Sequence, residues 1–263
     1  KEKAGEMSFT PDAEFPIINI EKGALKGTLR KARKAEGILR SLTAGVAVNA
    51  VPQKAVLEFT KLSEEDFQKA KDIVEKECGV QIQKDGNTVS VIGMSAHAST
   101  PHLGKNAGLA ALRFAVLLPE VSAEDKKYLE SILTLFPYGV TDGSGIGIKM
   151  QDEESGDLTC TLDIFSLDEK EMYFIFDSRV PICGNKENCE DVARKFSEEK
   201  GFCFETKGMI PPHHVPKDSD FIKALLSCYE KVTGEKGECI AIGGGTYVHE
   251  VENGVAFGAI LPD

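Results

Sequence analysis

The order of predicted strands and helices constrains the fold of this chain more than any other feature of its sequence. Twice along the chain, two strand-like segments precede an amphipathic helix and a further strand, first within residues 44–93 and again within residues 158–207. This mixture of elements is typical of an α+β protein. The two halves match in pattern and not in residue identity, so the pattern favours an internal duplication.

Local signals set the limits of several elements. Ser63 is a suitable N-cap for a helix with acidic residues in its first turn, and Gly79 ends that helix. Residues 85–87, Asp-Gly-Asn, predict a turn between two strands. Pro211 and Pro212 mark a boundary. Strands are predicted at residues 17–20, 24–29, 44–51, 56–62, 80–84, 88–93, 158–165, 171–180, 202–207, 239–242 and 255–261, and helices at 63–78, 106–118, 123–135, 186–200 and 220–233.

The composition indicates a folded, soluble protein. Hydrophobic residues make up 41% of the 263 residues and charged residues 28%, which is ordinary for a globular chain. No apolar run approaches the roughly 18 residues that cross a bilayer, and no signal peptide opens the sequence. The net charge of -11 disfavours nucleic-acid binding, which needs clustered cations. The one basic stretch, residues 26–34, is interpreted as the solvated face of a helix.

The cysteines predict the compartment. There are seven of them, an odd number, and none forms a C-x-x-C pair. This spacing fits neither a zinc ribbon nor the disulfide framework of a small secreted protein. A reducing cytoplasm is therefore the expected location.

A histidine within residues 93–107 is the first candidate for catalysis. His97 follows a predicted strand among small residues, which leave its imidazole accessible, although a lone loop histidine can equally be structural. The whole segment resembles the lid-domain histidine segment of the dinuclear-zinc exopeptidase family. That family includes bacterial dipeptidase V, Xaa-His dipeptidase, carnosinase, aminoacylase and glutamate carboxypeptidases. The resemblance implies that His97 stabilises a tetrahedral oxyanion through an imidazole N–H.

A second motif concerns metal binding. Residues 10–16, Thr-Pro-Asp-Ala-Glu-Phe-Pro, resemble the segment after the catalytic Glu-Glu pair in the dipeptidase V branch. The resemblance implies that Asp12 is a zinc ligand, for which a carboxylate oxygen is suitable. The residues alone would favour an exposed turn aspartate. Glu14 is assigned to the surroundings of the site or to the surface.

A third motif contains three consecutive glycines. Gly243, Gly244 and Gly245 precede Thr246, and such a run exposes backbone N–H groups and allows close approach of a ligand. A nucleotide-binding loop is disfavoured because neither G-x-G-x-x-G nor a following Lys-Ser/Thr is present. In the family, an equivalent turn forms the floor of the substrate site. The resemblance therefore assigns these four residues to substrate binding.

Two further residues match substrate-binding positions of the family. Arg179 ends a predicted strand just before Pro181, where relatives use arginine to bind the C-terminal carboxylate of the substrate. A planar guanidinium can form two parallel hydrogen bonds with a carboxylate, which lysine cannot. Asn49 resembles the lid asparagine that binds substrate. No ligand position matches the other histidines of the C-terminal region, His213, His214 and His249, and the first two are expected in a surface loop.

Most of the family's metal site does not occur in this sequence. The His-x-Asp segment, the bridging aspartate and the Glu-Glu pair would precede Asp12, and a final histidine would follow residues 257–262. We therefore expect a fragment that does not hydrolyse peptides by itself. The parent enzyme would hold two zinc ions, with manganese or cobalt as alternatives.

The resemblance implies a division into two parts. Residues 23–212 would form an α+β lid of two ferredoxin-like units, and residues 1–22 and 213–263 would be remnants of an α/β catalytic domain. The expected partner is a small dipeptide, with no nucleic acid and no membrane, and a duplicated lid would favour a monomer. Two alternatives stay open: a sibling amidohydrolase such as an aminoacylase or deacetylase, and a non-catalytic binding or dimerisation module.

Overall fold

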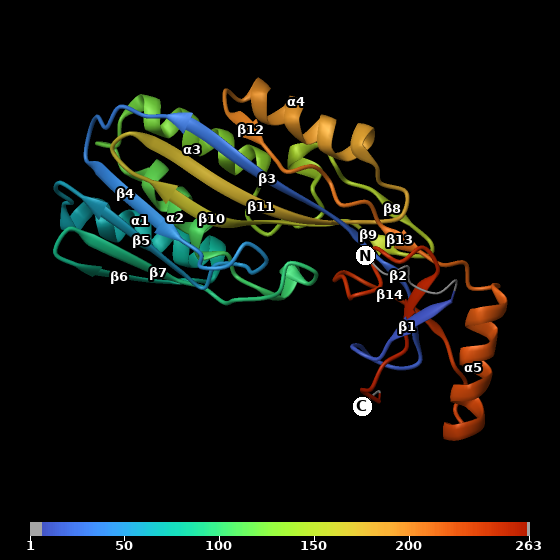
Figure 1. Ribbon diagram of the computed structural model, residues 1–263. Coiled ribbons are helices and arrows are strands. Elements are labelled where there is room, and N and C mark those ends of the chain that lie inside the picture. Colours follow the sequence, from blue (N-terminus) through green and yellow to red (C-terminus); the bar gives the residue numbers. More distant parts are fainter. Residues whose placement is uncertain (1–6, 262–263) are drawn as a thin grey trace.

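The computed structural model describes residues 7–261, and two separate β-sheets organise them (Figure 1). The larger sheet has eight strands in the order β12-β3-β11-β10-β4-β5-β7-β6, and all its pairs are antiparallel. Its strands are β3 (Gly23–Ala32), β4 (Leu39–Ala44), β5 (Lys54–Phe59), β6 (Gln81–Asp85), β7 (Thr88–Ile92), β10 (Thr159–Leu167), β11 (Glu171–Val180) and β12 (Cys203–Glu205). A short pair, β8 (Gln151–Asp152) and β9 (Gly156–Asp157), lies outside both sheets.

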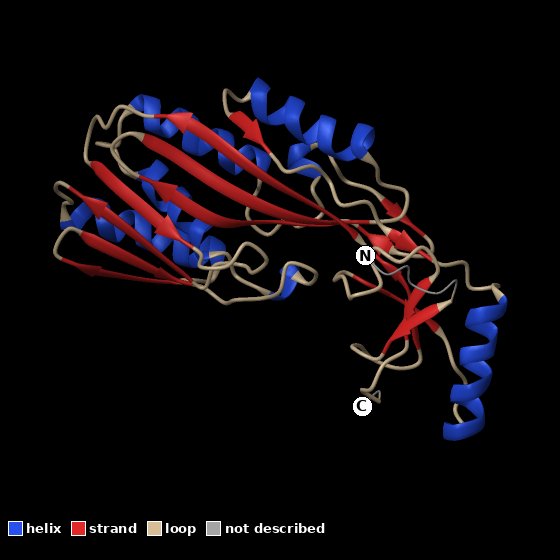
Figure 2. Ribbon diagram, viewed as in Figure 1, coloured by secondary structure: helices blue, strands red, loops and turns tan. Residues whose placement is uncertain are grey.

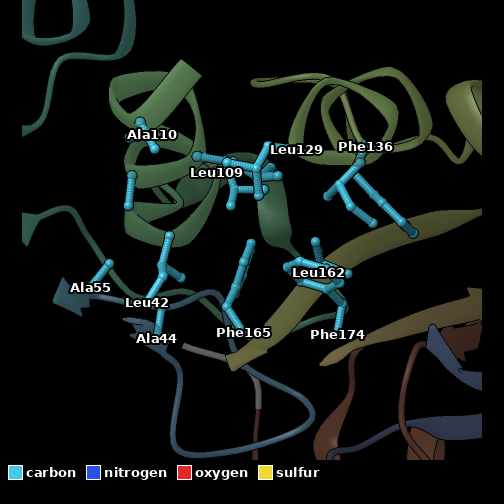
Figure 3. Packing of buried hydrophobic residues seen from close by; sticks show 14 of the residues in the cluster. Leu42, Ala44, Ala55, Leu109, Ala110, Leu129, Phe136, Leu162, Phe165 and Phe174 are labelled. Carbon is cyan, nitrogen blue, oxygen red and sulfur yellow. The ribbon is translucent and has the colours of Figure 1, made fainter. Parts of the chain in front are cut away.

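Four helices cover one face of the large sheet. They are α1 (Glu64–Cys78), α2 (Ala107–Leu117), α3 (Ala123–Leu135) and α4 (Asp191–Glu199), and α4 is preceded by a π-helical turn, η3 (Lys186–Glu190). Two short 3-10 helices, η1 (Pro101–Leu103) and η2 (Ser144–Ile146), lie in loops. All four helices contribute to one core (Figure 3), in which Leu109 and Ala110 of α2 lie above Leu42 and Phe165 of the sheet. Helix α2 is apolar on nearly every side because α1 and α3 flank it.

The small sheet lies beside one end of the large sheet (Figure 2). It contains β1 (Ser8–Thr10), β2 (Ile17–Glu21), β13 (His213–His214), β14 (Cys239–Ile242) and β15 (Gly254–Ala256), and helix α5 (Asp220–Thr233) packs beside it. Strand β2 pairs with β13, β14 and β15, so it is the central strand, and every one of its residues is buried. The expectation that His213 and His214 lie in a surface loop is wrong, because both are half-buried and pair with β2.

Most predicted elements are present within a few residues, but three predictions are wrong. The strand predicted at 44–51 is a loop, because β4 ends at Ala44 and the backbone turns at Gly45 with φ 83°. The basic stretch 26–34 is not a helix: it lies largely in β3, where Lys26 is exposed and Arg33 is buried just beyond the strand. The strand predicted at 255–261 is restricted to β15. Within residues 7–261 no helix is long and apolar enough to cross a membrane.

A buried ion pair joins several elements of the large sheet at one point. Arg33 binds Asp125, in the first turn of α3, through Nε and Nη2, each 2.8 Å from a carboxylate oxygen. Its remaining N–H groups donate to the carbonyl oxygens of Leu39, Arg40 and Asp168. All five guanidinium donors therefore have acceptors, which offsets the cost of burying the charge. The pair ties β3, β4, α3 and the β10–β11 turn together.

We predict that Asp125→Ala lowers the free energy of unfolding by about 3–5 kcal/mol, because it leaves the buried Arg33 charge without its partner. Urea denaturation of wild type and variant measures the difference. Glu171→Ala is the matched control, since Glu171 pairs with Arg30 where both side chains are more than a third exposed. Equal losses in the two variants would contradict a special contribution of the buried pair.

Candidate functional site

His97 lies in the loop that leads from β7 to η1, and its ring is exposed. Two contacts with Ser99 fix the orientation of the ring. The Ser99 backbone N–H donates to Nδ1 at 3.2 Å, and Ser99 Oγ lies 2.7 Å from the same nitrogen. A ring nitrogen that accepts from a backbone amide carries no proton itself, so the proton of the neutral ring is on Nε2. His97 therefore presents an N–H donor on its exposed side.

Asn49 lies in the loop between β4 and β5, directly beside the His97 loop. The backbone carbonyl oxygen of Asn49 accepts a hydrogen bond from the Ala98 N–H at 2.9 Å, and Ala50 forms an antiparallel backbone bridge with His97. The Ala98 carbonyl in turn accepts from Thr159 Oγ1 at 2.8 Å, which fastens the His97 loop to the first residue of β10. The structure thus brings Asn49 and His97 together at one end of the large sheet.

Arg179 is placed at the same end by strand pairing, because it lies opposite Thr159 in the β10–β11 ladder. Its guanidinium is largely buried and bridges two elements. Nη2 lies 2.9 Å from Asp177 Oδ2, and Nη1 donates to the Gly243 carbonyl at 2.7 Å. Nε has no hydrogen-bond partner among the described residues. Arg179 therefore holds the Gly-rich turn against the large sheet, and its buried Nε–H is left without an acceptor within residues 7–261.

The Gly-rich turn approaches the His97 loop at Gly243. A Cβ on this residue would lie 2.6 Å from the Ser99 Cβ, so a larger residue would push the two loops apart. Glycine is needed here for close approach rather than for an unusual backbone conformation. Gly244 and Gly245 meet no such obstacle, since no atom lies within 3.4 Å of a Cβ built on either. Thr246 hydrogen-bonds to the buried Glu21 through its backbone N–H and its hydroxyl group.

Two buried carboxyl groups lie behind Arg179. Asp163 and Asp177 are both 0% exposed, and three of their four oxygens have no hydrogen-bond partner within residues 7–261. Burial, reinforced by the charge of Asp177, raises the pKa of Asp163 to about 8. Burial also raises the pKa of Asp177, although the Arg179 and Lys26 charges oppose the change. Asp163 is therefore neutral at pH 7, while Asp177 forms the ion pair with Arg179.

Asp12 makes none of the described contacts with the residues of this region. It is exposed, and its recorded hydrogen bond joins its own N–H to Thr10 Oγ1 at 3.4 Å. Glu14 is also exposed and bridges Ile260 through the backbone. In the part of the chain that the structure describes, no group of three or more His, Cys, Asp or Glu residues could hold a metal ion. These residues do not by themselves fit a metal centre.

Sequence reasoning missed several residues of this region. Asp177 could have been found, since residues two apart in a strand share a face and Asp177 precedes Arg179 by two positions. Ser99 and Thr159 act through hydrogen bonds to His97 and to the Ala98 carbonyl, which no local pattern marks. Asp163 is an isolated acid in an apolar strand, at the point where the β10–β11 register shifts, and its environment depends on the charge of Asp177 on the neighbouring strand.

Comparison with known proteins gives relatives over almost the whole chain. No family model matches. The chain is 32% identical over 99% of its length to YtjP of Bacillus subtilis (strain 168), provisionally named a dipeptidase. It is 32% identical over 98% of its length to beta-Ala-Xaa dipeptidase of Lactobacillus delbrueckii subsp. lactis. It spans 58% and 56% of the lengths of these two relatives.

A solved structure shares the fold. Aminoacylhistidine dipeptidase from Vibrio alginolyticus superposes with a TM-score of 0.53 at 14% sequence identity. The match covers 97% of this chain and 59% of the other. The chain thus matches somewhat more than half the length of each of these three proteins.

We predict that Asp163→Asn changes how stability depends on pH. The folded-state pKa of Asp163, about 8, lies above the ordinary value, so its proton stabilises the fold at low pH and this contribution is lost as pH rises toward 8. The free energy of unfolding of the variant, relative to that of wild type, should therefore rise by up to about 1.4 kcal/mol per pH unit between pH 5 and 8. Chemical denaturation at several pH values measures this difference.

Asp142→Asn is the control for that measurement. Hydrogen bonds from Lys149 and Ser144 lower the pKa of Asp142 to about 2, so this group does not titrate between pH 5 and 8 in either state. Its variant should differ from wild type by a constant amount in that range. An Asp163→Asn variant that also differed by a constant amount would show that Asp163 is ionised throughout.

Proposed function

Because the chain belongs to the dipeptidase family that includes beta-Ala-Xaa dipeptidase, we propose that it forms the substrate-binding part of a dipeptide hydrolase. The observation that carries the proposal is the His97–Ser99 contact. It leaves an Nε2–H donor on an exposed ring, next to the asparagine and the Gly-rich turn that also match the family. Such a donor can stabilise the negative charge that develops on the carbonyl oxygen during attack on a peptide bond.

Arg179 would bind the C-terminal carboxylate of the dipeptide. Its guanidinium is already oriented by Asp177 and the Gly243 carbonyl, so little side-chain entropy would be lost when substrate binds. Nη1 and Nη2 each carry a second N–H beyond the bonds to Gly243 and Asp177, and these would donate to the carboxylate oxygens. Asn49, Gly243, Gly244, Gly245 and Thr246 would line the same site. We assign neither the nucleophile nor the base that activates it to a residue of this chain.

The proposed division places the lid at residues 23–212, with two ferredoxin-like units fused in the eight-stranded sheet. Residues 1–22 and 213–263 would belong to a catalytic domain; of these, residues 1–6 and 262–263 lie outside the described residues. The strand pairing supports this division, because β2 and β13 belong to one sheet while β3 and β12 belong to the other. The boundary falls between Glu21 and Gly23 and again near Pro212.

The small sheet supports the proposal of a larger catalytic domain. Beside α5 lies an open apolar hollow of about 1020 Å³. Phe15, Tyr229, Val232, Ile240 and Phe257 are among its lining residues, and Val232 is 86% exposed. Apolar side chains left on one side of a sheet usually pack against another layer. We propose that the rest of the catalytic domain covers this hollow and supplies the metal ligands other than Asp12, with zinc as the expected metal.

We predict that His97→Ala, in the polypeptide that includes the remainder of the catalytic domain, lowers kcat for dipeptide hydrolysis about 100- to 1000-fold with little change in KM. The lost donor acts on charge that exists only in the transition state. Steady-state kinetics with zinc present measures the effect. His102→Ala, at an exposed histidine five residues later, is the control. An unchanged kcat in His97→Ala would refute the oxyanion role.

We further predict that Arg179→Lys raises KM about 10- to 100-fold for dipeptides with a free C-terminus, because lysine keeps the charge but loses the planar fork. Dipeptides with an amidated C-terminus provide the comparison. The wild type should prefer the free acid, and the variant should lose that preference. If both proteins discriminate equally between the two substrates, Arg179 does not bind the carboxylate.

A further inference from the structure

Two segments of the chain pass between the sheets, and they run side by side. One connects β2 to β3 through Lys22, and the other connects Ile210 to β13 through Pro211 and Pro212. Backbone hydrogen bonds of 2.8 and 3.0 Å pair Ala24 with Ile210. These two connecting segments join the proposed lid to the proposed catalytic domain.

His249 contacts both connecting segments at once. Its Nδ1 lies 2.8 Å from Oε2 of Glu21, at the end of β2, and its Nε2 lies 2.9 Å from the carbonyl oxygen of Pro211. The ring is largely buried, and the Glu21 side chain is 1% exposed. A histidine that only filled space would not place both ring nitrogens on oxygen atoms of two different segments.

Glu21 extends the same network into the Gly-rich turn. Its Oε1 accepts from the Thr246 backbone N–H at 3.0 Å and from Thr246 Oγ1 at 2.5 Å. Next to it, the Lys22 N–H donates to the Ile242 carbonyl at 2.9 Å. Glu21 thus uses one carboxylate oxygen for the turn and the other for His249. Hydrogen bonds to an ionised group are about twice as strong as those between neutral groups.

We propose that Glu21 and His249 are positioning residues that clamp the Gly243–Thr246 turn to both connecting segments. The clamp sets the separation of the turn from Ser99 and Arg179, and hence the shape of the substrate site. This rests on the proposed function only in assigning the turn to substrate binding. The clamp itself depends on the contacts of Glu21 and His249 with Thr246 and Pro211.

The position of the clamp explains why the loss of one of its hydrogen bonds would shift the Gly243–Thr246 turn. Gly243 approaches Ser99 closely at one end of the turn, and its carbonyl accepts from Arg179. Thr246 is anchored at the other end by Glu21. A turn that is held at both ends cannot shift without breaking a hydrogen bond to a charged side chain. Loss of the Glu21 end would leave the Arg179 end as the remaining side-chain anchor among the contacts described.

Hydrogen exchange of backbone amides tests the clamp without requiring activity. In the full polypeptide, Glu21→Gln and His249→Gln should each accelerate exchange in a peptide spanning residues 243–249 at least tenfold. His249→Arg should restore much of the protection, because a guanidinium can donate to both Glu21 and Pro211. His214→Gln is the matched control: His214 lies on the neighbouring strand, and its recorded side-chain contact is with Glu154.

The outcomes separate the clamp from a general effect on stability. Faster exchange confined to residues 243–249 supports the clamp, whereas uniformly faster exchange throughout the small sheet, or no change in either Gln variant, overturns it. Should one Gln variant not fold, as judged by circular dichroism, the other decides the result in the same way.

Kinetics on the same proteins adds a second readout. The clamp predicts a raised KM for dipeptides in Glu21→Gln and His249→Gln, and a smaller rise in His249→Arg. Wild-type hydrolysis with an unchanged KM in both Gln variants would overturn the clamp and leave the proposed function intact. Absence of hydrolysis in wild type would overturn the proposed function, and the exchange result would still decide on the clamp.

Discussion

The close passage of the two connecting segments is the constraint on which the rest of the structure depends. A Cβ on Gly23 would lie 2.5 Å from the Ile210 carbonyl oxygen and 2.8 Å from the Pro212 nitrogen, so only glycine allows the two segments to pair there. Because β3 continues from Gly23 and β13 from Pro212, this crossing fixes where the small sheet stands relative to the large one.

The candidate site combines residues from both sheets. A series of neighbouring polar side chains leads from the large sheet to the Gly-rich turn. Asp163 is held neutral by burial, Asp177 carries the charge that pairs with Arg179, and Arg179 reaches the Gly243 carbonyl. A second series runs from the Pro211 carbonyl through His249 and Glu21 to Thr246. The first series of contacts ends at Gly243 and the second at Thr246, so together they hold both ends of one four-residue turn. Rigid support on both sides is what a preorganised substrate site requires.

The sequence predicted the elements well where local chemistry decides, and less well where tertiary contacts decide. Ser63 and Gly79 bound α1 as expected, because capping is a local interaction. The loop after Gly45 was misassigned as a strand because its valines alternate with small residues, yet Val46 is fully exposed in the structure. The sequence motifs predicted roles for His97, Asn49 and Arg179, but the proximity of these residues depends on strand pairing. Nothing local could reveal that Glu21 is buried, since its partners are more than 200 residues away.

The pairing of β3 with β11 has a consequence for how the chain acquires its structure during synthesis. The register runs without interruption from Gly23 opposite Val180 to Ala32 opposite Glu171. Strand β3 is made well before its partner β11, which emerges only after β4 to β7 and three helices have been completed. Closing so long a loop is slow, and until then β3 presents unpaired backbone groups. Exposed strand edges of this kind favour aggregation, so the delay in pairing leaves β3 open to contacts with other chains while the protein is being made.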